Sequence, residues 1–314
     1  MSPPGRPKGE RRSAQHAGTP VSTATAPDQR TAGVLLFLAA LLCFALYDAF
    51  AKQMVGSFSP VAVNLGRYIA VGGLALAWLL HSGERRPWRA PHQRLLLLRA
   101  LMLAITATCF MTALVSMPLA EATAIYFTAP LVMVALSPWL LGEHVAARQW
   151  LAVAAGFAGM LLIVRPGGAL PLAGSLLMAV AALCYALFQL LTRKLSGRVP
   201  AATQYAYMAV VCLVVTQMVI HVPALAGPAG AWPSALQMAM LVAGGLVSGL
   251  AQWLLLAAFR RVPLATLAPM NYLQLLLAVL ISSFWFQRPP DAWALAGMGL
   301  IAAAGVALAL KARA

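Results

Sequence analysis

Charged residues are scarce in this chain, and acidic residues are the scarcest of them. Only 9% of the 314 residues are Asp, Glu, Lys or Arg, and the acidic ones number seven. A water-soluble domain of this length would carry about a quarter charged residues. Together with the 62% hydrophobic content, this scarcity excludes an ordinary soluble protein and indicates that lipid surrounds most of the chain.

Histidine and cysteine, the residues of metal and redox sites, are also few. The five histidines are scattered over loops and segment ends, and the four cysteines lie singly in apolar segments without metal-ligand spacing. We therefore expect no metal site and no disulfide, and interpret the cysteines as small packing residues. The sequence also lacks a nucleotide-binding loop and any Ser/His or His/Asp constellation. No ATP-driven process, no enzyme activity and no cofactor are expected.

Basic residues are in excess, with a formal net charge of +15. In a soluble protein this charge would suggest a nucleic-acid partner. Here the basic residues lie between apolar runs, and no basic groove with stacking aromatics is present. We interpret them as topology signals that face anionic lipid, and expect no nucleic-acid binding.

Ten apolar segments are each long enough to cross a bilayer core of roughly 30 Å. Residues 1–30 are rich in Pro, Ser, Thr, Gly and Arg, and are expected to form a disordered tail. The first apolar run lacks a cleavage site and is interpreted as a retained span. The predicted fold is an all-α membrane protein with ten transmembrane helices, at 32–52, 60–80, 95–116, 119–141, 146–164, 171–192, 203–222, 235–258, 264–286 and 292–310.

Parts of the first half of the chain return in the second half. Cys43-Phe-Ala-Leu-Tyr-Asp-Ala-Phe-Ala-Lys52 returns 141 positions later as Cys184-Tyr-Ala-Leu-Phe-Gln-Leu-Leu-Thr-Arg193, and Ala113-Leu-Val-Ser-Met-Pro-Leu-Ala120 returns 145 positions later. Each copy holds five spans, and an odd number turns the second copy upside down. We predict two inverted five-helix repeats, 31–166 and 170–310, around a central cavity, which is the architecture of secondary transporters.

The distribution of Lys and Arg predicts the orientation. With the N-terminus in the cytoplasm, eighteen of the 22 basic residues fall on the cytoplasmic side. Such a bias is strong, so both termini are predicted to be cytoplasmic, in the inner membrane of a bacterium.

Few ionisable residues lie inside the predicted spans: Asp48, Arg67 and Glu121, with Lys52 at a helix end. A charge inside the bilayer is costly, so such side chains usually face a cavity or a partner. Two interpretations remain open. One is an ion-pair network of Asp48 with Lys52 and of Glu121 with Arg67, which fixes helix packing. The other is a polar pocket in which Arg67 anchors an anionic group and Asp48 or Glu121 binds a cationic group or a proton.

The matching positions of the second repeat keep the polarity but drop most of the charge. They are Gln189 for Asp48, Arg193 for Lys52, Tyr207 for Arg67 and Thr266 for Glu121. This pattern favours a pocket with one charged half and one neutral half.

Further polar and aromatic residues lie near prolines of spans 4 and 9. Proline exposes backbone carbonyls, which a membrane tolerates where the backbone is buried or lines water. The predicted substrate-binding residues are Asp48, Lys52, Asn64, Arg67, Glu121, Tyr126, Gln189, Tyr207, Trp253, Asn271 and Gln274.

Spans 5 and 10 carry almost no polar side chains. They contain Ala155-x-x-x-Gly159 and Gly299-x-x-x-Ala303, and span 8 contains Gly245-x-x-x-Gly249. Small residues four apart permit close helix packing. We expect spans 5 and 10 to serve as scaffold or as homodimer contacts, and span 8 to pack closely near the cavity.

The chain resembles the drug/metabolite transporter superfamily, specifically its members with two EamA-type repeats. The carrying residues are Asp48-Ala-Phe-Ala-Lys52, Arg67-Tyr68, Pro118-Leu-Ala-Glu-Ala-Thr-Ala-Ile125 with Ala129-Pro130, Leu141-Gly-Glu143, and Gly156-Phe-Ala-Gly159 running into Arg165-Pro-Gly167. The second repeat departs from the pattern, because Gln287-Arg288 stands where the family often has Gly-Glu.

The resemblance implies ten helices, a cavity between the repeats and alternating access by rocking. It also implies a small organic solute, such as an amino acid, S-adenosylmethionine or riboflavin. The predicted function is a secondary transporter of a small polar or zwitterionic metabolite. An intramembrane lipid-modifying enzyme is the alternative.

Overall fold

The computed structural model describes residues 27–82, 90–142, 144–164, 170–195, 198–222, 232–259, 261–262 and 267–311. All regular structure in these residues is helical. The helices are α1 (Pro27–Met54), α2 (Pro60–Ser82), α3 (Gln93–Ser116), α4 (Leu119–Tyr126), α5 (Ala129–Leu141), α6 (Ala147–Val164), α7 (Leu172–Leu195), α8 (Ala201–Val219), α10 (Ala235–Phe259), the 3-10 turn η2 (Ala268–Asn271), α12 (Tyr272–Phe284) and α13 (Ala292–Lys311).

The predicted spans coincide with these helices, and the all-α membrane fold is confirmed. Within the residues that the structure describes, eight helical segments are long and apolar enough to cross a membrane. The two remaining predicted spans correspond to the shorter apolar helices Tyr272–Phe284 and Ala292–Ala307. Helix α1 begins at Pro27, inside the predicted tail; proline suits a first helical position because its missing N–H would have no helical partner there.

The fourth span of the first repeat is broken, where the sequence predicted one continuous helix. Helix α4 ends at Tyr126 and α5 begins at Ala129, with Pro130 in its first turn. The fourth span of the second repeat also begins irregularly, with η2 ahead of α12. Broken helices of this kind form the binding sites of many transporters.

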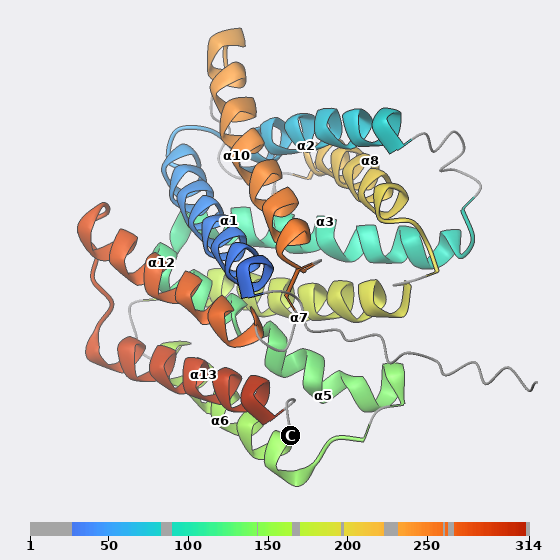
Figure 1. Ribbon diagram of the computed structural model, residues 1–314. Helices are drawn as coiled ribbons and strands as arrows, with labels where there is room; N and C mark the ends of the chain where they lie inside the picture. Colours follow the sequence, from blue (N-terminus) through green and yellow to red (C-terminus); the bar gives the residue numbers. More distant parts are fainter. Residues whose placement is uncertain are drawn as a thin grey trace, which may run out of the picture.

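Helix packing reflects the duplication. Helix α3 of the first repeat packs along α7 of the second. The equivalent helices, α10 of the second repeat and α1 of the first, pack in the same way. The contact of α2 with α10 has its counterpart in the contact of α8 with α3, whereas α6 packs on α13 and α2 on α8. Figure 1 shows α1 beside α10, and α6 beside α13 at the bottom of the view. The two repeats are therefore exchanged by an approximate two-fold axis.

Two aromatic residues mark the position of this axis. Phe127 and Tyr272 occupy equivalent positions, 145 residues apart, and their ring centroids lie 5.8 Å from each other. Equivalent groups that touch each other must lie at a two-fold axis. The breaks in the two fourth spans thus meet at the centre of the molecule.

Glycines bring α6 and α13 close together at the edge of the fold. A Cβ atom on Gly159 would lie 2.7 Å from the carbonyl oxygen of Gly297, and one on Gly297 would lie 2.5 Å from that of Gly159. Gly299 has no heavy atom within 4 Å of such a position. The predicted scaffold packing uses Gly159 but pairs it with Gly297, and a homodimer through these helices stays a prediction.

Several sequence features lie outside the described residues. They are residues 1–26 of the predicted tail, Arg85, Arg86, Arg89, Glu143, the segment 165–169, Arg260, Pro263, Thr266 and Arg313.

Candidate functional site

Asp48 and Gln274, both predicted site residues, meet across the two repeats. The side-chain amide of Gln274 donates a hydrogen bond of 3.1 Å to the Asp48 carboxylate. Asp48 lies on α1, and Gln274 lies in the first turn of α12, directly after the 3-10 turn η2. The bond therefore joins the first span to the ninth at the level of the helix break.

Arg67 lies on α2 with its guanidinium over the ring of Tyr47, 4.9 Å from the centroid. Its charge interacts through space with that of Asp48. The Nε atom of Arg67 is buried and has no hydrogen-bond partner among the described residues. Such an atom is costly unless a ligand or water satisfies it. This makes Arg67 the strongest single indicator of a binding site.

Close packing of α10 against α2 fixes the backbone at Arg67. A Cβ atom on Gly245 would lie 2.7 Å from the Cα of Arg67 and 2.9 Å from the carbonyl oxygen of Gly66. Only glycine fits such a crossing. The predicted role of Gly245 in close packing near the site agrees with this geometry.

Tyr126 and Gln189 are joined through a third residue, Tyr185. The rings of Tyr126 and Tyr185 lie 4.9 Å apart, and the Gln189 side chain donates a 3.2 Å hydrogen bond to the Tyr185 hydroxyl. Arg67 interacts electrostatically with both tyrosines. Aromatic residues from both repeats therefore lie near the charges of Asp48 and Arg67.

Lys52 has a different environment from the one predicted. Its ammonium donates hydrogen bonds of 2.5 Å and 2.7 Å to the carbonyl oxygens of Leu114 and Met117, at the C-terminal end of α3. A cation at this end of a helix is favourable, because the last carbonyls are otherwise unpaired. Lys52 thus ties α1 to α3.

Glu121 is buried, at 7% exposure, in the first turn of α4. One of its carboxylate oxygens has no hydrogen-bond partner within the described part of the chain. No ion pair joins Glu121 to Arg67, or Asp48 to Lys52, among the described residues. The ion-pair network that the sequence left open is therefore not formed.

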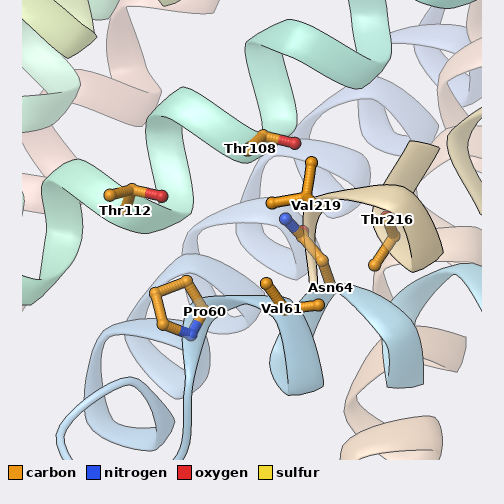
Figure 2. A pocket seen from close by; sticks show the side chains of 7 residues that line it. All are labelled: Pro60, Val61, Asn64, Thr108, Thr112, Thr216 and Val219. Atoms are coloured by element: carbon orange, nitrogen blue, oxygen red, sulfur yellow. The ribbon is translucent and has the colours of Figure 1, made fainter. Parts of the chain in front are cut away.

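Asn64 lies in a small pocket between α2, α3 and α8 (Figure 2). Its amide nitrogen donates a 3.2 Å hydrogen bond to the carbonyl oxygen of Ala107, and its oxygen is buried without a partner. Thr108 and Thr216, which also line the pocket, donate to carbonyls of their own helices. Asn64 fixes the α2–α3 contact one turn from Arg67.

Three predicted residues lie apart from this group or at its margin. Trp253 is 58% exposed on the outer side of α10. Tyr207 packs on the cluster of Leu96, Leu195 and Val199. Asn271 is the last residue of η2, directly before α12.

The sequence analysis missed Tyr47 and Tyr185, which supply the aromatic faces of the site. The internal repeat carried a usable signal for both, because it aligns Tyr47 with Phe188, directly before Asp48 and Gln189, and aligns Tyr185 with Phe44. Arg99, one of the basic residues that the sequence analysis assigned to the cytoplasmic side, makes contacts that the sequence did not predict. Arg99 is 7% exposed, donates 2.6 Å and 3.2 Å bonds to Thr192 and to the Gln204 carbonyl, and lies over Phe188.

The central group, defined as Asp48, Arg67, Tyr47, Tyr126 and Tyr185, offers one cation, one anion and three aromatic rings. Arginine can bind a carboxylate or phosphate, and a carboxylate can bind an ammonium or another cation. Tyrosine faces can stack on a planar ring or on a cation. This set of groups can therefore bind charges of either sign and a planar ring.

Comparison with known proteins identifies relatives along nearly the whole chain. It is 25% identical to an S-adenosylmethionine uptake transporter of Rickettsia bellii over 271 residues, covering 86% of this chain and 90% of the relative. It is also 25% identical to a riboflavin transporter of Rhizobium johnstonii, covering 91% and 93%. A solved crystal structure with 22% identity shares the fold, with a TM-score of 0.62 over 90% of this chain and 99% of the other.

The family comparison covers both repeats. The EamA-like transporter family matches residues 31–165 and again residues 172–310. The two matched segments agree with the two groups of five spans, and the transporter names agree with the prediction that the chain is not an enzyme. The chain is a multi-pass membrane protein that belongs to the EamA-like transporter family of the drug/metabolite transporter superfamily.

Proposed function

We propose that the chain is a secondary transporter of a small polar or zwitterionic metabolite, carried through the region between Asp48, Arg67 and the tyrosines. Arg67 anchors an anionic group of the solute, and Asp48 binds a cationic group. Tyr47, Tyr126 and Tyr185 hold the apolar or cyclic part.

The observation that carries this proposal is the state of Arg67. Its charge lies on an apolar helix, and no described carboxylate pairs with it directly. Its guanidinium reaches the Tyr47 hydroxyl, but its buried Nε has no hydrogen-bond partner in the described part of the chain. A purely structural arginine would have its donors satisfied, as Arg99 has through Thr192 and Gln204. An anionic solute group supplies what Arg67 lacks.

The named solutes of the relatives give candidate chemistry. S-adenosylmethionine and riboflavin each combine a planar ring system with a polar chain. The central tyrosines and the two charges suit such a combination, so both compounds and free amino acids form the first panel of solutes to test.

Alternating access follows from the two-repeat arrangement. The Asp48–Gln274 bond connects α1 to α12 and so crosses between the repeats. A solute group that binds Asp48 competes with Gln274 for the carboxylate. Solute binding is therefore coupled to the contact between the two moving parts.

Counterflow in proteoliposomes tests this function. Vesicles preloaded with an unlabelled candidate should accumulate the labelled compound, and Arg67→Ala should reduce the initial rate by about 30- to 150-fold, as loss of a 2–3 kcal/mol charged contact implies. Arg148→Ala, an exposed cation of α6, is the matched control and should retain the normal rate. Normal counterflow by Arg67→Ala would disprove the site.

A further inference from the structure

A second cavity lies away from the central group, where α1, α3 and α12 end. Its volume is about 270 Å³. Two cationic side chains, Lys52 and Arg288, line it together with Ser116 and Ser282. Pro118 and Phe286 supply part of the apolar wall. The predicted orientation places this cavity at the outer face of the membrane.

Lys52 can donate one more hydrogen bond in this cavity. An ammonium carries three N–H donors, and two of them bind the carbonyl oxygens of Leu114 and Met117. These bonds fix the position of the nitrogen on the wall. The third donor is left for a ligand.

The backbone around Arg288 is fixed as well. The Arg288 amide donates a 2.9 Å hydrogen bond to the Ser282 carbonyl, and the Ser282 hydroxyl donates a 2.9 Å bond to the Arg288 carbonyl. Ser282 itself is fully buried. These two hydrogen bonds fix the backbone from which the Arg288 side chain extends.

Gln287 holds a backbone conformation that favours glycine. Its φ is +52°, in the left-handed region, and the equivalent residue of the first repeat, Gly142, has a φ of +69°. A non-glycine residue there costs about 1–2 kcal/mol. The turn is kept in both repeats although the second lacks its glycine, and it places a cation at 288 where the family often has an acid. Backbone strain of this kind is found at functional positions.

The two cations are not neutralised by a carboxylate of the described residues. Their positive charges repel each other. Asp291 accepts a 2.7 Å bond from the Ala294 amide at the start of α13. Glu121 lies close enough to Asp291 for the two acids to repel each other, and neither acid lines the cavity. The cavity is therefore electropositive.

We propose that this cavity is a second binding site, which takes one carboxylate or phosphate group of a solute through Lys52 and Arg288. Its volume suits a compact anionic group and not a whole large cofactor. The cavity lies at the helix ends, whereas Arg67 lies at the centre of the molecule. We therefore expect the transported solute to bind this cavity on its way to or from the central group. That role rests on the proposed function, whereas anion binding does not. The headgroup of an anionic lipid has the same chemistry and is the rival occupant.

Charged thiol reagents test the site without any transport assay. Ser116→Cys places a thiol on the cavity wall of the full-length protein, reconstituted in phosphatidylcholine vesicles. A negatively charged methanethiosulfonate should label this cysteine at least about tenfold faster than a positively charged one. Inorganic phosphate should slow the labelling in a saturable way, beyond an equal ionic strength of chloride. The chain without the added cysteine sets the background.

Variants of the cations provide the controls. Arg288→Gln in the Ser116→Cys protein should abolish the phosphate effect and bring the two labelling rates close together. Arg148→Gln, on α6 away from the cavity lining, should change neither. Equal rates for both reagents, or phosphate protection that survives Arg288→Gln, would overturn the proposal.

Lipid composition separates the two occupants. If phosphatidylglycerol in the vesicles slows labelling and removes the phosphate effect, the cavity holds a lipid headgroup, and the solute role is wrong. If protection by phosphate persists in these vesicles, the solute role is supported. Counterflow by the same protein reports on the proposed function separately, so a failure of one leaves the other measurable.

Discussion

Four ionisable residues of the first repeat, each in or at the end of an apolar span, have four different environments. Asp48 accepts a bond from Gln274, Arg67 lies over Tyr47, Lys52 binds helix-end carbonyls, and Glu121 is buried with one oxygen unpaired. Sequence could locate these residues because polar side chains stand out in apolar runs. It could not assign their partners, since those lie up to 226 positions away.

Asp48→Asn tests the charge at the centre. The asparagine oxygen can still accept the Gln274 bond, so folding should be retained. Loss of the negative charge should weaken transport of solutes with a cationic group by about tenfold or more, as one charge-assisted hydrogen bond implies. The counterflow rates of neutral solutes should change little. Counterflow rates across the solute panel measure both, and equal losses for cationic and neutral solutes would count against a charge role.

Lys52→Met tests the helix-end contact. Methionine has a similar length but cannot donate to Leu114 and Met117. Each charge-assisted bond contributes roughly 1.5–3 kcal/mol, so the unfolding midpoint of the purified protein should fall, and Lys52→Arg should restore part of it. An unchanged midpoint for Lys52→Met would show that water replaces both bonds.

At the scale of helices, the ten spans followed from length and apolar composition alone. The break in the fourth span did not, because residues 119–141 form one long, mainly apolar segment and Pro130 is compatible with a first helical turn. The break depends on contacts with the other repeat at Phe127. Long-range packing of this kind has no signal in local sequence.

Gly245→Leu tests the α2–α10 crossing. A leucine side chain would clash with the backbone of Gly66 and Arg67, and overpacking costs about 1–3 kcal/mol or more. Thermal stability and the yield of folded protein should both fall. Gly299→Leu on α13, where a Cβ meets open space, is the matched control and should be tolerated. Comparable stability of the two variants would exclude a tight crossing.

At the scale of the whole molecule, the charge bias predicts opposite orientations for the two repeats. Cysteines at position 148 of α6 and position 288 after α12 should react from opposite sides of the membrane. An impermeant maleimide applied to intact cells should label Arg288→Cys and spare Arg148→Cys until the membrane is permeabilised. Labelling of both positions from one side would contradict the inversion.

The contact between Phe127 and Tyr272 has a consequence for how the protein could diverge. In a dimer of two identical half-length chains, one residue would occupy both sides of this contact and would have to fit against itself. Any change there would occur twice. Fusion into one chain removes that constraint, and the two sides now differ: one ring carries a hydroxyl and the other does not. The same freedom allows Asp48 to carry a charge that Gln189 lacks, so a solute with two unlike ends can be distinguished by its orientation.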